Sequence, residues 1–186
     1  MNKQLIKLAE TTLLILEKKS WHSIKIDEVY KKTKINKKNF QNKVNNKFDL
    51  LRNINHYFDF KLRNITDSID QSTRRDMIFE IIMMRFDILQ IHRKPIIKIF
   101  EFFKKKPQEL VFLLPSLIES MISMAGLAKI PVVGIKGNLK VKGLLIIYFS
   151  SFLVWVKDNS ESLEKTMTSL DNHLDRSGKL LSIINI

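Results

Sequence analysis

Apolar residues recur at intervals of three and four along almost the whole chain, and alternating strand-like patterns are absent. Only four prolines and five glycines interrupt the 186 residues. Because such intervals place apolar side chains on one face of a helix, the sequence predicts an all-α fold of about nine helices. We expect them near residues 2–18, 24–33, 36–43, 46–67, 72–91, 93–105, 108–127, 138–157 and 160–178.

Positive charge is concentrated in the first third of the chain. Residues 1–63 hold 15 Lys and Arg against 6 Asp and Glu, whereas residues 64–186 hold 17 against 13. A clustered basic surface favours a polyanion such as nucleic acid or an anionic membrane. A general over-use of Lys, Asn and Ile accounts for part of this charge, so the excess alone does not identify the partner.

The composition excludes several classes of site. The chain has no cysteine, which removes disulfides, zinc-thiolate sites and cysteine nucleophiles and fits a cytoplasmic location. The first 20 residues lack a signal-peptide pattern. The longest uncharged apolar run covers the 14 residues 143–156, whereas a membrane span needs about 20. We therefore expect a buried helix or an interface there, and no membrane partner.

Residues 24–44 have the pattern of a helix-turn-helix. A short helix with acids in its first turn is followed by a tight connection at Lys34 and Ile35, and Asn36 is placed to cap a second short helix. Asn46 is placed to cap the next helix, with Asp49 in the capping-box position. Four apolar residues are spaced to meet between the two short helices and pack them together. They are Val29, Ile35, Phe40 and Val44.

The outer face of the second short helix carries amide and lysine side chains, which contact bases and phosphates in DNA complexes. The alternative for each lysine is a solvated side chain without a partner. The predicted DNA-binding residues are Lys25, Asn36, Lys37, Lys38, Gln41, Asn42, Lys43 and Lys47.

The stretch from Trp21 to Leu51 resembles the DNA-binding head of the TetR family of transcriptional regulators. Trp21 matches the aromatic residue that ends the loop after the first helix of that family. Three further segments match the starts of its second, recognition and fourth helices, namely 26–29, 35–40 and 46–51. The resemblance implies a DNA-binding domain at residues 1–63, an effector-binding and dimerisation domain at residues 64–186, and a phosphate contact by Lys47.

This chain departs from the family pattern at four positions of the head. Tyr30 stands where the family usually has Ala, and Lys34 stands where it has Gly, which removes an easy left-handed helix cap. Gln41 replaces a Tyr that commonly contacts phosphate, and Val44 replaces a Phe. The framework of the head is therefore more typical of the family than its DNA contacts.

Segments 85–93 and 155–174 resemble helices of a TetR subgroup, and also a TetR-fold family of lipid-binding accessory proteins of ubiquinone biosynthesis. The second family carries an acidic and aromatic stretch that this chain lacks, and its heads are degenerate. The resemblance therefore favours a DNA-binding transcriptional regulator that acts as a homodimer and as a ligand-responsive repressor. A membrane-associated lipid-binding protein is the alternative.

In TetR-like proteins the last two helices form a four-helix dimer interface. The helix over residues 143–155 is apolar nearly all round, and such a helix must be covered on more than one side. The predicted dimer residues are Leu145, Phe149, Phe152, Leu163, Met167 and Leu170.

The middle helices carry Met and Phe residues that could line a pocket for a small apolar effector. Ordinary core packing is the alternative, because Met fills irregular gaps. The predicted pocket residues are Met83, Phe86, Phe100, Phe103, Met121 and Met124.

Nothing in the sequence predicts an enzyme or a cofactor. The four histidines have no metal-ligand spacing, and no nucleophile elbow or phosphate-binding glycine loop is present. Residues 134–137 match the GxxG of an RNA-binding loop but lack its strands, and we interpret them as a turn between helices.

Overall fold

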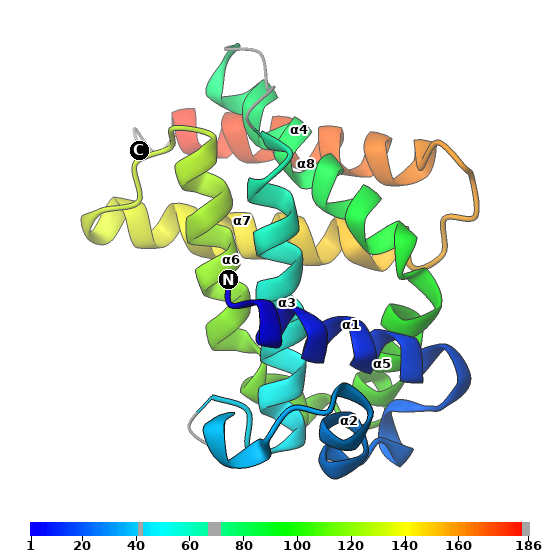
Figure 1. Cartoon of the computed structure of the whole chain (residues 1–186). Coiled ribbons are helices and arrows are strands. Elements are labelled where there is room, and N and C mark those ends of the chain that lie inside the picture. Colours follow the sequence, from blue (N-terminus) through cyan, green and yellow to red (C-terminus); the bar gives the residue numbers. More distant parts are fainter. Residues whose placement is uncertain (41–42, 67–71, 184–186) are drawn as a thin grey trace. The chain divides into compact units, whose positions relative to one another are not determined.

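The computed structural model describes residues 1–40, 43–66 and 72–183, and these residues are helical with no strand among them. The all-α prediction is confirmed. Figure 1 shows the elements in chain order. They are α1 (Lys3–Lys18), η1 (Trp21–Ser23), α2 (Ile26–Thr33), η2 (Lys37–Phe40), α3 (Lys47–Arg63), α4 (Arg74–Ile91), α5 (Arg93–Lys105), η4 (Pro107–Phe112), α6 (Leu114–Leu127), α7 (Gly134–Trp155) and α8 (Glu164–Ile183).

The chain forms two compact units. The first comprises Met1–Lys61 and Ile88–Leu117, and the second comprises Leu62–Asp87 and Ile118–Ile186. Helices α3, α4 and α6 therefore contribute residues to both units. The division into functional domains at residue 63 stays a prediction.

The first unit is built around α1. Its buried face carries Leu8, Leu13 and Leu16, and its start is capped by Asn2, whose Oδ1 accepts a hydrogen bond from the amide of Gln4. At the other end, the ammonium of Lys98 on α5 donates to the carbonyls of Leu16 and Glu17, at 2.7 and 3.0 Å. These bonds satisfy acceptors that a helix end leaves open.

The second unit contains α7 and α8, which lie side by side (Figure 1). Asp158 follows α7 and joins the two helices. Its Oδ1 accepts from the hydroxyl of Ser160, and its Oδ2 accepts from the amide and hydroxyl of Thr166, both at 2.8 Å. Burial alone would raise the pKa of Asp158, but these hydrogen bonds outweigh burial and lower it to about 2.

The structure corrects three helix boundaries. The last helix begins at Glu164 rather than at residue 160. The reason is that the amide of Thr166 donates to Asp158 and that Leu163 takes a left-handed φ of 53°. The predicted helix over 108–127 is divided into η4 and α6, and Pro115 in the first turn of α6 favours a new start there.

The third correction concerns residues 134–137, which form the first turn of α7 and not a turn between helices. Gly134 enters the helix with a φ of 70°, a conformation that glycine adopts without strain.

Helix α7 is long and apolar enough to cross a membrane by length and composition alone. Seven of its 22 residues are buried: Gly137, Val141, Leu144, Ile147, Tyr148, Ser151 and Trp155.

Candidate nucleic-acid interface

The predicted helix-turn-helix lies in the first unit as α2, a left-handed turn and η2. Lys34 ends α2 with φ 57° and ψ 25°, and its amide donates to the carbonyl of Lys31 at 3.3 Å. Lys34 thus takes the conformation that glycine provides at this place in the TetR pattern. Asn36 Oδ1 accepts from the amide of Lys38 at 3.0 Å, which confirms the predicted cap.

The second short helix is described only in part. The structure has a 3-10 turn over Lys37–Phe40 where the sequence predicts the start of a helix over 36–43. The run Lys-Lys-Asn-Phe contains no strong helix former except lysine. Gln41 and Asn42, the predicted base-contacting residues, lie outside the described residues, as does the side chain of Phe40.

Tyr30 links α2 to the segment that precedes α3. Its buried hydroxyl donates to the carbonyl of Val44 at 2.7 Å, and burial raises the pKa of the phenol. Val29 and Val44 are fully buried, as predicted, and Ile35 is half-buried. The larger side chain at position 30 therefore adds a hydrogen bond that the alanine usual in the TetR pattern could not make.

Helix α3 begins with the capping box that the sequence predicts. Asn46 Oδ1 accepts from the amides of Phe48 and Asp49 at 2.8 and 3.0 Å. In return, Asp49 Oδ2 accepts from the amides of Asn45 and Asn46 at 3.0 and 3.1 Å. This reciprocal arrangement fixes where the chain enters α3 after the helix-turn-helix.

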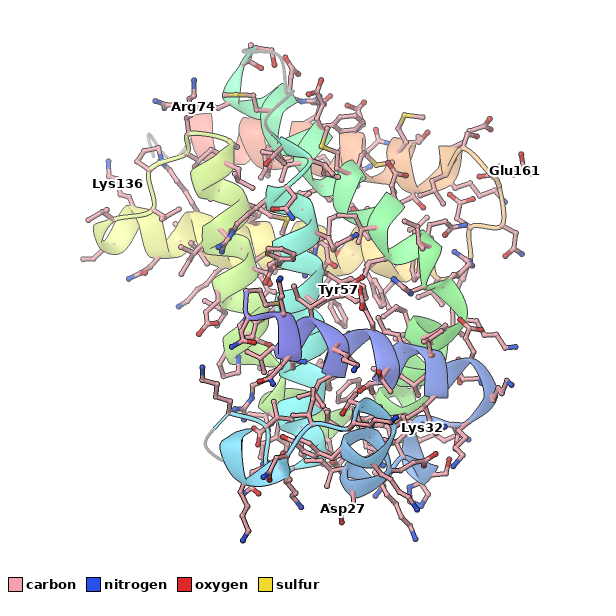
Figure 2. The ribbon with its side chains drawn as sticks, viewed as in Figure 1. Asp27, Lys32, Tyr57, Arg74, Lys136 and Glu161 are labelled. Carbon is pink, nitrogen blue, oxygen red and sulfur yellow. The ribbon has the colours of Figure 1, made fainter. Side chains whose placement is uncertain are left out.

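The two acids of α2 are neutralised within the first unit. Glu28 pairs with Lys19 at 2.9 Å and with Lys32 at 3.3 Å, and the hydrogen bond from Lys19 is the main reason that the pKa of Glu28 is lowered. Asp27 pairs with Lys37 at 2.7 Å. Figure 2 shows Asp27 and Lys32 projecting from α2. Of the predicted contacts, Lys37 is therefore already engaged by a carboxylate.

Five other lysines around the turn are exposed and, among the described residues, have no carboxylate within 4.0 Å. We call them the head lysines; they are Lys25, Lys31, Lys34, Lys38 and Lys43. Lys25, Lys38 and Lys43 are among the DNA-binding residues predicted from sequence, whereas Lys31 and Lys34 are not. The position of Lys34 at the tip of the turn was the available signal for including it.

Lys47 occupies a more enclosed position than its neighbours. Its ammonium donates to the carbonyl of His22 at 2.8 Å and lies 5.3 Å from the ring centroid of Trp21, and burial lowers its pKa. Trp21 is itself fully buried and is a core residue of the first unit. Lys47 therefore ties the start of α3 to η1, and within the part of the chain that the structure describes two of its three N–H donors are left for another acceptor.

The predicted effector residues are divided between the units. Phe100 and Phe103 lie on α5 in the first unit, whereas Met83, Phe86, Met121 and Met124 lie in the second. In the second unit, Phe86, Met121 and Met124 are fully buried, and Phe86 stacks on Tyr148 with 5.4 Å between centroids. An effector at these residues stays a prediction.

A buried cation was missed by sequence reasoning. Arg85, fully buried in the second unit, donates through Nε to the hydroxyl of Tyr148 at 3.2 Å and through Nη2 to Ser120 Oγ at 3.5 Å. The guanidinium thereby joins α4, α6 and α7. The available signal was that Ile81 and Ile82 precede it by four and three residues, so that they lie on the same face of the helix.

The predicted dimer residues differ in exposure. Leu163 and Leu170 are buried within the protomer, Leu145, Phe149 and Phe152 are half-buried, and Met167 is exposed. Two further apolar residues on α7 are exposed, Ile146 and Leu153.

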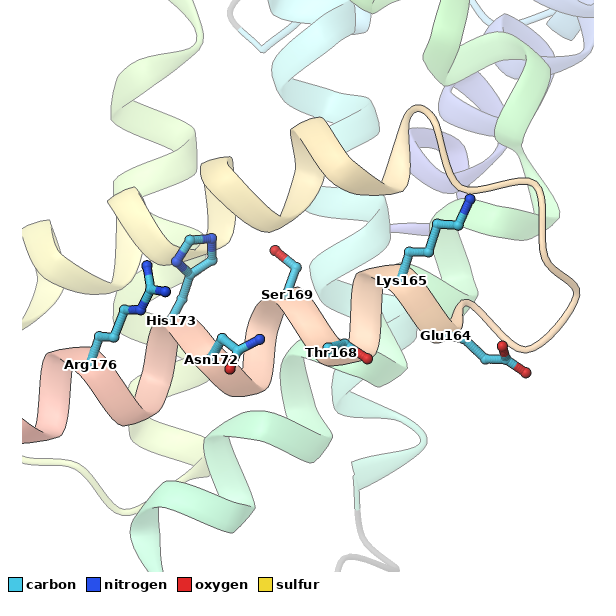
Figure 3. A pocket seen from close by; sticks show the side chains of 7 residues that line it. All are labelled: Glu164, Lys165, Thr168, Ser169, Asn172, His173 and Arg176. Atoms are coloured by element: carbon cyan, nitrogen blue, oxygen red, sulfur yellow. The ribbon is translucent and has the colours of Figure 1, made fainter.

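A shallow groove runs along α8 (Figure 3). Its lining is polar and differs entirely from the predicted effector residues. It consists of Glu164, Lys165, Thr168, Ser169, Asn172, His173 and Arg176. Among the residues that the structure describes, no three His, Asp or Glu side chains are grouped as metal ligands.

Comparison with known proteins adds information at the level of the fold. No family model matches the sequence, and no curated protein matches it. A solved structure, the TetR transcriptional regulator from Nitrosomonas europaea ATCC 19718, superposes with a TM-score of 0.71 at 16% sequence identity. The match covers 95% of this chain and 99% of that chain. The chain therefore has a TetR-like fold.

Proposed function

We propose that the chain is a DNA-binding transcription regulator. The observation that carries this proposal is the group of head lysines, which are exposed around a helix-turn-helix whose acids are already paired. The TetR-like fold supports it, because a solved structure of that fold is named as a transcriptional regulator. Lysines without carboxylate partners are free to neutralise phosphates, and release of counterions then drives binding.

The test is binding of the purified protein to DNA that it enriches from its own genome, measured by gel shift at several salt concentrations. The triple variant Lys34→Ala, Lys38→Ala, Lys43→Ala should bind more weakly and with a flatter salt dependence, by about 0.9 in slope for each phosphate that is no longer neutralised. The matched control replaces three exposed lysines of α1, Lys3, Lys7 and Lys18. Equal weakening in both variants would refute a specific role for the head.

Sequence preference is assigned to Gln41 and Asn42 in this proposal. Amide side chains can form paired hydrogen bonds with an adenine edge, worth about 1–3 kcal/mol of discrimination. Replacing either by Ala should alter the preferred bases while leaving the salt dependence unchanged. Preserved base preference in both variants would argue that these side chains do not contact bases.

We further propose that the protein acts as a homodimer through α7 and α8. The support is the exposed apolar set Ile146, Leu153 and Met167, beside the half-buried Leu145, Phe149 and Phe152. Leu163 and Leu170 would support such an interface from within the protomer. A two-fold dimer places two heads in successive major grooves, one helical turn apart.

We also propose that the protein is a repressor and that a small apolar effector weakens its binding to DNA. It would contact the Met and Phe residues of the second unit, and coupling of this kind is typically about 1–3 kcal/mol. A library of apolar compounds tested for release of the protein from its DNA would identify it. No compound that changes DNA affinity would argue against ligand control.

The second candidate function is a membrane-associated lipid-binding accessory protein of quinone biosynthesis. The observation that favours it is the length and apolar composition of α7. Extraction of bound lipid from the purified protein, with failure to shift any genomic DNA, would support this function over that of a cytoplasmic regulator. Neither candidate is an enzyme or requires a cofactor.

A further inference from the structure

The connection between α6 and α7 presents the most exposed large apolar side chains of the described chain. Val133 is 90% exposed and Ile135 is 89% exposed, and they flank Gly134, the first residue of α7. Four lysines accompany them, at positions 129, 136, 140 and 142. We call Val133, Ile135 and these lysines the α7 tip; Figure 2 labels Lys136 in it.

No acidic residue lies near the α7 tip in sequence. The chain has no Asp or Glu from residue 120 to residue 157. Lys129, Lys136 and Lys142 are exposed, and Lys140 is half-buried. Since none of the four pairs with a carboxylate among the described residues, their positive charge is not neutralised locally.

Backbone contacts shape the connection that carries the α7 tip. After α6 ends at Leu127, Lys129 takes a left-handed conformation, φ 54°, and the amides of Lys129 and Ile130 donate to the carbonyls of Gly126 and Ala125 at 3.0 and 2.8 Å. Gly137 then packs against the backbone of Val132, so closely that a Cβ at position 137 would lie 2.0 Å from the Val132 carbonyl carbon. The connection is therefore folded back on the first turn of α7.

We propose that the α7 tip docks the protein on an anionic phospholipid surface. Val133 and Ile135 would enter the boundary between headgroups and acyl chains. The lysine stems can lie along the apolar region while their ammonium groups reach lipid phosphates. This is peripheral docking and not a membrane span, because α7 buries seven residues within the second unit.

Two other occupants fit the α7 tip less well. DNA would attract the lysines but leave Val133 and Ile135 without a role. A second copy that met this tip with its own tip across a two-fold axis would bring like-charged lysines together without acids to pair them. The proposal does not rest on DNA binding, and it revises the expectation from sequence that the protein has no membrane partner.

The experiment is co-sedimentation of the full chain with vesicles of phosphatidylcholine alone and with an equimolar mixture of phosphatidylcholine and phosphatidylglycerol. Wild type should sediment with the mixed vesicles and less with the neutral ones, and added salt should release it. The double variant Val133→Ser, Ile135→Ser should lose about tenfold in partitioning at each site. The control, Leu14→Ser with Ile91→Ser, removes apolar side chains that are 69% and 74% exposed and should sediment like wild type.

Two further variants test charge and shape separately. Replacing Lys129, Lys136 and Lys142 by Gln should lower partitioning by about fivefold for each lysine, whereas replacing Lys3, Lys7 and Lys18 should not. Gly137→Ala keeps every charge and apolar side chain but displaces the connection, so partitioning should fall. Gly143→Ala on the same helix is its control, since a Cβ there meets nothing within 4 Å.

Circular dichroism and the DNA gel shift, run on each variant, report folding and the proposed regulatory function independently of vesicle binding. Equal sedimentation with neutral and anionic vesicles, or none at all, would overturn the proposal. So would a Val133→Ser, Ile135→Ser variant that keeps vesicle binding but changes its mass in light scattering, which would assign the α7 tip to contact between copies.

Discussion

Lys34 shows how one residue can maintain a backbone conformation at an energetic cost. It holds a left-handed conformation at the end of α2, where its side chain is also one of the head lysines. Left-handed backbone is unfavourable for residues with a Cβ and free of that strain for glycine. A lysine at this position therefore makes the fold less stable than glycine would, and it places a positive charge at the tip of the turn.

We predict that Lys34→Gly stabilises the protein by about 1 kcal/mol in urea denaturation and weakens DNA binding. Lys31→Gly is the matched control, because Lys31 is an exposed lysine within α2. There glycine should cost roughly 0.5–1 kcal/mol. A loss of stability in Lys34→Gly would show that the strain at this turn is relieved by other contacts.

The enclosed position of Lys47 predicts two effects from one substitution. Lys47→Ala removes the bond to the His22 carbonyl and should cost about 1 kcal/mol of folding free energy, measured by thermal denaturation. If its remaining donors contact a phosphate, binding should weaken equally for all DNA sequences and the salt slope should fall by about 0.9. A changed base preference with an unchanged slope would contradict this role.

At the scale of the elements, the residues that cap helices were the most predictable part of the structure. Asn46 with Asp49 and Asn36 with Lys38 form the hydrogen bonds that the sequence predicts. Such caps are local, so a few neighbouring residues determine them. The start of α8 was not predictable in this way, since Asp158 reaches Thr166 eight residues later.

The lowered pKa of Asp158 makes this connection sensitive to acid. Because the folded pKa is about 2 and the unfolded value is near 3.8, the carboxylate contributes stability above about pH 4, and this is lost as the pH falls towards 2. We predict that Asp158→Asn costs about 2 kcal/mol at neutral pH, and that the difference from wild type disappears near pH 2.

The control for this experiment is Glu161→Gln, which changes an exposed acid in the same connection (Figure 2). It should alter the free energy of unfolding by less than about 0.5 kcal/mol at any pH. A constant difference between Asp158→Asn and wild type from neutral pH to pH 2 would argue against the carboxylate as the titrating group.

At the scale of the whole molecule, the proposed dimer makes the sharpest prediction. Ile146 is 67% exposed on α7, so Ile146→Asp should be tolerated by a monomer. In a two-fold interface the substitution occurs twice, and a desolvated, unpaired carboxylate costs several kcal/mol. We expect the variant to fold, to become monomeric in light scattering, and to lose binding to a two-fold DNA site.

Ile91→Asp is the control, at a residue on α4 that is 74% exposed, and it should leave the mass unchanged. A wild type that is monomeric at micromolar concentration would refute the dimer.

The fold class was predictable because apolar periodicity runs through the whole chain, whereas contacts between distant segments were not. The capping of α1 by Lys98 joins residues 82 positions apart. The placement of Arg85 beside Tyr148 joins residues 63 positions apart. The α7 tip was missed for a different reason: the GxxG segment was interpreted as a turn, and only the backbone contact of Gly137 with Val132 shows how Val133 and Ile135 are presented.

The two tryptophans of the chain give each compact unit its own optical signal. Trp21 is fully buried in the first unit beneath the ammonium of Lys47, and Trp155 is fully buried in the second against Phe86 and Phe152. Trp21→Phe would leave fluorescence from the second unit alone, and Trp155→Phe would leave fluorescence from the first. Emission recorded during denaturation of the two variants would therefore show whether the units melt together or one after the other.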